Sequence, residues 1–543
     1  MSSTCYDYLK ESYKRNGNFT AAIAFGSKTS LSKMIQDVDS LAGYITSAGI
    51  KSGDVVTVFL PNVIHAFVAF YALNKIGVIA NIVHPLTSPD ALKENMEFTK
   101  SKAVMILDIL AGDYADVINE SGLPCIICSN SDYVSPLMYP VIKLYEKKKS
   151  NSLERYADSI KYSTALAKGR NVKTNDCRDG EKTAVYLHGG GTTGKSKTIM
   201  LSSANINAIA DKLKSFDNVD HKPGAECSLV VLPMFHAFGL AVAMHFPLLN
   251  GFTLLPMTQF SAEGANKLMH KYCVSFILGV PNMFKKMYEE KHFAGPHLKN
   301  MRLVFCGGDF LPERLIREFN EKIAEYGGKG RLFRGYGLTE VGSVCVVNRY
   351  DAVKEDSIGK PLDGVTVEVW DEMKNKLPAG QTGELVIKGS TVMQGYYNGD
   401  NTVRNEGVYI DKNGARWVLT GDLGYIDKDG FVFFTGRKKR MIIISGYNVY
   451  PADIENSVLT LPFVSEACAV QGYHKSRPCV KLCVTLKYPM NHDDAKDKIQ
   501  SYCKKNLAKF SCPRKIEILD SMPRTKMAKI DFMALSDKYT PEK

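Results

Sequence analysis

The sequence predicts an α/β fold for most of the chain, followed by smaller units with different patterns. With 543 residues the chain is too long for one hydrophobic core, so we expect two to four domains. An apolar run at Asp54–Leu60, a helical pattern at Ile64–Ile76 and a second apolar run at Val78–Val83 alternate as βαβ units do. From Gly359 to Gly389 this alternation gives way to short strands separated by turns. These observations predict a large α/β region and then a small all-β unit.

The charged stretches and the apolar runs also predict how the last part of the chain is organised. In the small all-β unit, the expected strands are Val365–Trp370 and Gly383–Ile387. The charged stretch Arg437–Arg440 lies between two apolar runs and marks the expected domain boundary. From about Met441 to the end we expect a further segment of strands and helices.

Composition limits the class of protein without identifying it. The chain is 45% hydrophobic, 10% aromatic and 23% charged, which is ordinary for a globular protein and disfavours disorder, collagen and coiled coils. Its net charge of +12, from 69 basic and 57 acidic residues, suits an anionic partner such as a nucleotide, coenzyme A, nucleic acid or a membrane surface. No nucleic-acid-binding motif occurs and the lysines are spread along the chain, so we expect no nucleic-acid partner.

The cysteines and the N-terminus predict a cytoplasmic protein. Thirteen cysteines lie without regular spacing behind a polar N-terminus, Met1–Thr20, that has no apolar signal core. Cys125 and Cys128 form a C-x-x-C, but they flank two isoleucines and lack two further ligands at zinc spacing. We therefore expect the reducing cytosol, and a buried strand at these cysteines.

Two segments raise the question of membrane contact. Cys227–Ala262 carries no charged residue, but its three prolines and two histidines would leave polar groups unsatisfied in lipid. There we expect a buried helix followed by a core strand at Phe252–Leu255, and no transmembrane span. The lysine-rich segment Val141–Lys149 predicts a basic amphipathic helix, for which a solvated surface is favoured and peripheral membrane contact stays open.

The glycine-rich stretch between Tyr186 and Asn205 matches two well-known patterns, but other features of the sequence argue against both interpretations. Gly189–Ser196 matches the Walker A pattern G-x-x-x-x-G-K-S, but a β-branched apolar run follows it before the helix-start signature Ser202, Ser203 and Asn205. Strand, glycine loop, strand is therefore expected, with a P-loop NTPase as a distant alternative. His188–Gly191 copies the oxyanion loop of some esterases, yet no G-x-S-x-G nucleophile elbow occurs in the chain.

A third interpretation accounts for the whole stretch. Backbone donors, the hydroxyls of Thr192 and Thr193 and the cations Lys195 and Lys197 suit a triphosphate. The loop resembles the phosphate-binding loop of the adenylate-forming superfamily, (S/T)-G-T-T-G-x-P-K-G, and departs from it at Gly190, Ser196 and Thr198. The resemblance implies that the loop binds ATP and that Thr192 helps to hold Mg²⁺; the nucleotide-binding positions are Gly191, Thr192, Thr193, Gly194, Lys195 and Lys197.

The superfamily's other motifs follow in order. Gly335-Tyr336-Gly337-Leu338-Thr339-Glu340 resembles its adenine-binding motif. Tyr336 can stack on a purine while Gly335 and Gly337 allow close approach, Thr339 can donate to the α-phosphate, and Glu340 can hold Mg²⁺.

Trp417–Asp422 is W-x-x-T-G-D, in which the resemblance assigns both ribose hydroxyls to Asp422. It assigns a second ribose contact to Arg437 and makes Lys439 the hinge of a small rotating domain. In Pro523–Ile530, which resembles P-x-T-x-x-G-K-I, Lys529 matches the catalytic lysine and Ala528 replaces the usual glycine.

The resemblance covers almost the whole chain. It includes Gly308 and Asp309 as nucleotide-binding residues and Gly446, beside which the pantetheine of coenzyme A would pass, and further matching segments are Leu60–Asn62, His84–Leu86, Met393–Tyr397 and Gly446–Pro451. It implies an N-terminal AMP-binding domain over residues 1–436, made of two doubly wound α/β subdomains and a small β-barrel-like subdomain, and a mobile α+β domain over 437–543.

The implied activity is that of an ATP-dependent acyl-CoA synthetase, which forms an acyl-adenylate and passes the acyl group to coenzyme A. In Leu232–Gly239, His236 stands where amino-acid-activating members carry Asp, so fatty or aryl acids are favoured as substrates over α-amino acids. A satisfied structural histidine is the alternative for His236. Residues expected near the acyl pocket are Phe238, Gly307, Tyr336, Gly342 and Ser343.

Other functions share these motifs and stay open. A fatty acyl-AMP ligase that loads a carrier protein, or a luciferase-like oxygenase, would also adenylate an acid. A nucleotide-binding protein without enzymatic activity would bind ATP but release no pyrophosphate in response to an acid.

Overall fold

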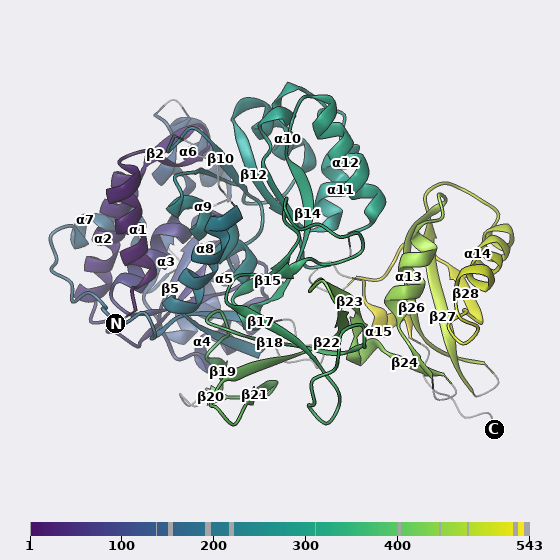
Figure 1. Ribbon diagram of the computed structural model, residues 1–543. Helices are drawn as coiled ribbons and strands as arrows, with labels where there is room; N and C mark the ends of the chain where they lie inside the picture. The colour runs from purple at the N-terminus through teal and green to yellow at the C-terminus, as the bar shows by residue number, and fades with distance from the viewer. Residues whose placement is uncertain are drawn as a thin grey trace. The chain divides into compact units, whose positions relative to one another are not determined.

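The computed structural model, shown in Figure 1, describes residues 2–136, 138–149, 156–189, 197–216, 222–309, 311–399, 403–444, 447–474, 477–524 and 530–536. The chain divides into two compact units. The first comprises Met1–Val353, Gly359–Thr366 and Ile387–Val418, and the second comprises Lys354–Ile358, Val367–Val386 and Leu419–Lys543. The fold is the expected mixture of large α/β and small α+β parts.

The first unit contains two nine-stranded sheets. One has the order β16-β15-β14-β13-β12-β10-β11-β1-β2, parallel from β14 to β1 and antiparallel at both edges. Its strands are β1 Thr20–Ala24, β2 Ser27–Ser30, β10 Cys227–Val230, β11 Thr253–Pro256, β12 Val274–Gly279, β13 Leu303–Cys306, β14 Arg331–Leu338, β15 Ser343–Val347 and β16 Lys360–Pro361.

The second sheet has the order β20-β19-β9-β8-β4-β3-β5-β6-β7. It is parallel from β8 to β7, whereas β9, β19 and β20 are antiparallel to their neighbours. Its strands are β3 Val55–Phe59, β4 Ile79–Ile82, β5 Ser101–Leu107, β6 Cys125–Cys128, β7 Ser159–Lys161, β8 Thr183–Gly189, β9 Lys197–Ser202, β19 Gly395–Tyr397 and β20 Val403–Arg404. The expected strand at Cys125–Cys128 is confirmed and fully buried.

Helices connect these strands. All twelve residues of α3, Ile64–Lys75, are buried, so its polar residues find partners inside the protein: Asn74, for example, bonds to Ser203. The other α-helices of this unit are α1 Cys5–Asn16, α2 Leu31–Ser47, α4 Pro89–Phe98, α5 Asp108–Ser121, α6 Tyr139–Lys149, α7 Tyr162–Gly169, α8 Ser203–Leu213, α9 Phe246–Leu249, α10 Ala262–Lys271, α11 Pro281–Glu289 and α12 Glu313–Glu325.

The long stretch without charged residues is largely buried as far as Leu255, as expected. It forms β10, a helical turn with π-type spacing at Phe238–His245, α9 and β11. His245, fully buried, is hydrogen-bonded to the Tyr71 hydroxyl at 2.8 Å and to Asn207 at 2.9 Å, so its polar atoms are satisfied within the fold. Within the described ranges, no helix has both the length and the apolar character that crossing a membrane requires.

The smaller sheets follow the change of pattern in the sequence. One has the order β17-β18-β22-β21, with β23 paired to β22. The second unit also holds a β-hairpin and a three-stranded sheet covered by α13 and α14, with a core that includes Ile454, Leu482 and Ile499. The elements are β17 Val365–Trp370, β18 Gly383–Gly389, β21 Val408–Ile410, β22 Arg416–Ile426, β23 Val432–Arg437, β24 Ile442–Ile444, β25 Tyr447–Val449, α13 Pro451–Leu459, β26 Val464–His474, β27 Arg477–Leu486, α14 His492–Asn506, β28 Lys515–Ile518 and α15 Phe532–Leu535.

Candidate functional site

The segment Gly335–Glu340 spans the last residues of β14 and the start of the turn that follows it. A short 3₁₀ turn, Thr339–Val341, follows the strand, and Gly342 with φ of +74° turns the chain back into β15. A Cβ on Gly337 would lie 1.7 Å from the Ser343 carbonyl oxygen, beside an irregularity in the β14–β15 register. Glycine is therefore required for this tight return, which places Thr339 and Glu340 in a half-buried turn directly after the end of β14 that carries Tyr336.

The end of the neighbouring strand β13 lies against this turn. A Cβ on Gly307 would lie 3.2 Å from the Gly335 carbonyl oxygen and 3.3 Å from Phe238 Cε1. Gly308 has φ of +83° and is exposed together with Asp309. The structure thus brings Gly307 and Phe238, which the sequence places near the acyl pocket, beside Gly335 of the adenine-binding motif.

Glu340 is held by a tyrosine that sequence reasoning did not single out. The Tyr396 hydroxyl donates a hydrogen bond of 2.9 Å to Glu340 Oε1, and the Glu340 carbonyl accepts one of 2.9 Å from the Met393 amide. Burial, and secondly the neighbouring Glu340 carboxylate, raises the pKa of Tyr396 far above its ordinary value, so the phenol stays protonated as a donor. The Met393–Tyr397 motif was the only signal for this residue.

The loop around His236 is fixed from two sides. The side chain of Asn62 accepts a 3.1 Å hydrogen bond from the Met234 amide and donates one of 3.1 Å to the Leu232 carbonyl. The ring of Phe235 packs between those of His84 and His236, at centroid distances of 4.2 and 4.7 Å. His236 itself is half-buried. Asn62 and His84, both in matching motifs, thus position the loop that carries His236.

The phosphate-loop candidates lie at the edge of what the structure describes. Gly191, Thr192, Thr193, Gly194 and Lys195 fall outside the described residues, as do Gly446 and Lys529 of the later motifs.

The flanks of that loop are strands, as the sequence predicts. β8 leads in, β9 begins at Lys197, and α8 begins only after Ser202, whose side chain caps it. In a P-loop a helix would begin at Lys195 and Ser196, whereas here a strand starts immediately after them, so the Walker A interpretation is wrong.

His188 and Thr198 explain a departure from the superfamily pattern. His188 Nδ1 lies 3.1 Å from the Thr198 hydroxyl, and its Nε2 lies 2.7 Å from Asn81 Oδ1. Burial lowers the pKa of His188 to about 4, which keeps the ring neutral. The Thr198 hydroxyl, at a position where the superfamily pattern has glycine, thus takes part in this hydrogen-bond network.

In the second unit, Asp422 sits on β22 opposite Arg437 of β23. The Asp422 side chain is 5% exposed, and Arg437 Nε lies 3.1 Å from its Oδ1. Gly421, with φ of +69°, donates its amide to Glu384 Oε1 at 2.9 Å, which fixes the turn before Asp422. The strand pair therefore presents a buried carboxylate with a cation beside it.

The predicted hinge lies between anchored neighbours. Lys438 Nζ lies 3.8 Å from Glu384, upstream of Lys439. On the other side Arg440 forms an ion pair with Glu455 of α13, which also accepts a 2.8 Å hydrogen bond from the Ala469 amide. Lys439 thus lies between a residue with a long, half-exposed ion pair and one with a close ion pair to α13.

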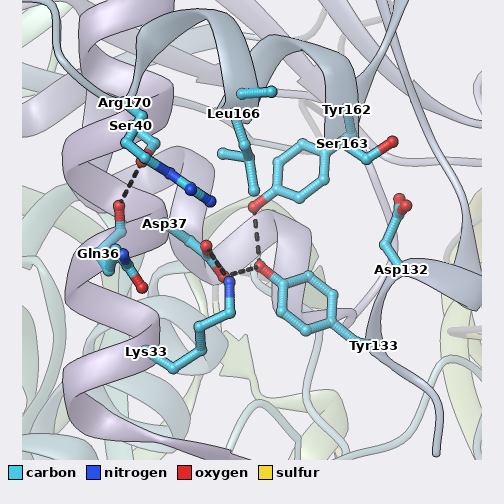
Figure 2. Close-up of a pocket in the computed structure, with 11 residues that line it drawn as sticks. Lys33, Gln36, Asp37, Ser40, Asp132, Tyr133, Tyr162, Ser163, Leu166 and Arg170 are labelled. Atoms are coloured by element: carbon cyan, nitrogen blue, oxygen red, sulfur yellow. Dashed lines mark hydrogen bonds and ion pairs between the residues drawn. The ribbon is translucent and has the colours of Figure 1, made fainter. Parts of the chain in front are cut away.

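A separate cavity of about 190 Å³ lies among α2, α7 and the 3₁₀ turn Asn130–Tyr133. Figure 2 shows Lys33 and Tyr133 both pointing at Asp37; the Tyr133 hydroxyl lies 2.8 Å from Asp37 and 2.9 Å from the Tyr162 hydroxyl. These buried groups satisfy one another, and none of the predicted nucleotide-binding residues lines the cavity. We assign it no role in the reaction.

Comparison with known proteins extends these observations to the family level. The family model described as AMP-binding enzyme matches residues 9–397, and that of the AMP-binding enzyme C-terminal domain matches residues 453–529. A long-chain-fatty-acid–CoA ligase of Escherichia coli O6:H1 is 28% identical over 540 residues, which cover 98% of this chain and 94% of the relative. One from Bacillus subtilis strain 168 is 27% identical, covering 99% of this chain and 95% of the relative.

Solved structures share the fold at lower identity. ATP-bound MatB from Rhodopseudomonas palustris superimposes with a TM-score of 0.81 at 23% identity, over 98% of each chain. An o-succinylbenzoate coenzyme A synthetase, MenE, from Bacillus subtilis in complex with ATP and a magnesium ion gives 0.77 at 23% identity, over 97% of this chain and 98% of the other. The arrangement of sheets described above is therefore shared along the full length.

Proposed function

The chain belongs to the AMP-binding enzyme family and is an AMP-forming acid–thiol ligase of the acyl-CoA synthetase type, and on that premise we propose that its acid is a fatty or aryl carboxylic acid. The observation that carries the substrate class is His236, where a carboxylate would be needed to meet the ammonium of an α-amino acid. The packing of Phe235 beside His236 gives the loop an apolar side, which suits an acyl or aryl group.

The reaction overcomes the poor reactivity of a carboxylate. The acid attacks the α-phosphate of ATP and pyrophosphate leaves, so that AMP replaces oxide as the leaving group; the thiol of coenzyme A then takes the acyl group. The protein must neutralise and align anions and needs no strong base. We propose that Tyr336 stacks on adenine, that Thr339 donates to the α-phosphate, and that Lys529 neutralises charge as the adenylate forms.

Mg²⁺ suits the residues present. Mg²⁺ binds through one or two carboxylates together with substrate phosphates, and Glu340 offers one carboxylate whose position Tyr396 fixes. Among the described residues no group of three or more His, Cys, Asp or Glu side chains could hold a metal alone, so the remaining ligands would come from ATP, water and Thr192, which lies outside the described residues. Bound there, the ion supplies positive charge for the phosphates.

The ribose and the remaining phosphate contacts complete the proposal. Asp422 accepts from the ribose hydroxyls and Arg437 adds a second contact, while Lys197 and the loop before it, with Gly308 and Asp309, approach the nucleotide. The two carboxylates and their partners are described, and they have the chemistry that these roles need. Coenzyme A would pass beside Gly446.

A panel of acids tests this function directly. Purified protein with Mg-ATP should release pyrophosphate only when a suitable fatty or aryl acid is added, and coenzyme A should convert the adenylate to a thioester. ATP hydrolysis at full rate without acid would contradict the proposal, as would a preference for α-amino acids.

The acceptor and the location are finer points of the same proposal. If an acyl carrier protein accepts the group and coenzyme A does not, the chain is an acyl-AMP ligase.

All thirteen cysteines are described and none is in a disulfide, which supports the proposed reducing, cytoplasmic environment.

We further propose peripheral contact of α6 with an anionic phospholipid surface. The sequence favours a solvated helix, but Val141 and Leu144, three residues apart on α6, are 57% and 61% exposed, and the same helix carries Lys143. Vesicles containing phosphatidylglycerol should sediment the protein in a salt-sensitive way, and Val141→Ser with Leu144→Ser should abolish this. Met373→Ser, at an 81% exposed position on the β17–β18 connection, is the control and should change nothing. Equal loss in both variants would contradict the assignment to α6.

A further inference from the structure

Tyr396 connects two parts of the nucleotide site that are far apart in the sequence. It lies on β19, whose pairing with β9 sets Tyr396 opposite Ile199. β9 begins at Lys197, where the chain leaves the phosphate loop. Residues two apart on a strand share a face, so Lys197, Ile199 and Tyr396 point to the same side of this sheet.

The ring and the hydroxyl of Tyr396 have different partners. Lys197 Nζ lies 4.5 Å from the centroid of the Tyr396 ring, a cation–π contact, and 3.2 Å from Glu406 Oε2. The Tyr396 hydroxyl, at the other end, donates to Glu340 Oε1. The residue is buried, which fixes both its ring and its hydroxyl.

A metal-binding carboxylate needs such a second partner. A carboxylate that binds a metal through one oxygen is oriented by a hydrogen bond to the other, and loss of such a partner lowers metal affinity. A neutral donor has a further advantage, because it orients Glu340 without cancelling the negative charge that attracts the metal. The geometry of Tyr396 meets both requirements.

We propose that Tyr396 is a positioning residue for the metal–nucleotide complex: its hydroxyl fixes Glu340 through Oε1, which would leave Oε2 available to the metal, and its ring holds Lys197, which would contact the triphosphate. The inference rests on the proposed function only in that Glu340 must meet Mg-ATP. It predicts that the hydroxyl and the ring have separable effects: loss of the hydroxyl should weaken metal binding, and loss of the ring should weaken ATP binding.

The test measures metal binding directly, using Mn²⁺ with ATP and the electron paramagnetic resonance signal of free Mn²⁺. Tyr396→Phe keeps the ring and removes the hydroxyl, so Mn²⁺ binding in the presence of ATP should weaken about 10- to 100-fold, the range for such outer partners. Binding of ATP without metal should be unchanged. Tyr396→Leu removes both groups and should weaken metal-free ATP binding as well.

Tyr397→Phe is the matched control, because Tyr397 is the next residue on β19 and its ring packs on Tyr186 and Phe98, at centroid distances of 4.9 and 5.3 Å. It should leave Mn²⁺ binding at the level of the unaltered protein. In a Glu340→Gln background, Tyr396→Phe should add no further loss, since the hydroxyl acts through that carboxylate. Equal losses in Tyr396→Phe and Tyr397→Phe, or an additive loss in the Glu340→Gln background, would overturn the proposal. If no acid supports turnover, the proposed function fails while this binding test can still be read.

Discussion

The two carboxylates predicted to meet the nucleotide are held in opposite ways. Glu340 of the first unit lies in a half-buried turn and accepts a hydrogen bond from a neutral phenol, whereas Asp422 of the second unit lies within a strand, is buried, and faces a guanidinium. The difference matches two tasks. A metal ligand should keep its full negative charge, while a carboxylate that accepts hydrogen bonds from neutral ribose hydroxyls works with a cation beside it.

The largest effect is expected at Lys529. Its loss tests whether the rate of adenylation depends more on a cation than on the two carboxylates. Lys529→Ala removes the charge that we propose bridges two anions in the adenylation transition state, so acid-dependent pyrophosphate exchange should fall by about 10² to 10³, as for a lost oxyanion donor. The variant should still convert supplied acyl-adenylate to thioester. Lys439→Pro, which stiffens the hinge, should show the reverse pattern. Equal loss of both half-reactions in both folded variants would exclude a rotating domain.

The next largest effect is expected at Asp422, and it distinguishes ribose binding by this residue from metal binding. Asp422→Ala should weaken ATP binding by a few kcal/mol, because each charged hydrogen bond to a ribose hydroxyl contributes about 1.5 to 3 kcal/mol. Calorimetric titration should find the same loss with and without Mg²⁺, since ribose binding does not involve the ion. A loss that appears only with Mg²⁺ would contradict the contrast drawn between the two carboxylates.

Glu340→Gln provides the opposite test. The amide keeps the shape but removes the charge, so the enhancement of ATP binding by Mg²⁺ should fall by about tenfold or more. Without metal, ATP should bind as well as before or slightly better, because a carboxylate no longer repels the triphosphate. An unchanged dependence on Mg²⁺ would remove Glu340 from the metal site.

The sequence predicted the fold to the level of individual strands where patterns were strong. The run Asp54–Val83 became β3, α3 and β4, and the charge-free segment became a buried helix and strand, because apolar periodicity over long runs reports burial directly. The π-type turn at Phe238–His245 was missed, since it follows from packing: a Cβ on Gly239 would lie 2.0 Å from the Pro233 carbonyl oxygen.

The sequence motifs name candidate nucleotide-binding residues, Tyr336, Glu340 and Asp422, whose roles stay predictions. They do not name the side chains that hold these residues in place. Tyr396 acts through Glu340, which is 56 residues earlier in the chain and is brought to it by tertiary packing. Thr198 is bonded to His188, its partner in the β8–β9 strand pair. A single sequence carries no signal for such pairs.

The smallest effect is expected at Arg437, and it measures how much the cation beside Asp422 contributes. The guanidinium is 60% exposed, so water screens its ion pair with Asp422 and the pair should contribute at most about 1 kcal/mol to stability. Arg437→Gln should therefore leave the thermal midpoint nearly unchanged and weaken ATP binding about fivefold or less, well below the effect of Asp422→Ala. Lys438→Gln is the matched control, because Lys438 also faces a carboxylate, Glu384, and should leave ATP affinity unchanged. If Arg437→Gln weakens ATP binding as much as Asp422→Ala does, the cation contributes as much to ATP affinity as the carboxylate. Glu340 and Asp422 would then differ in their binding partners more than in their own charge.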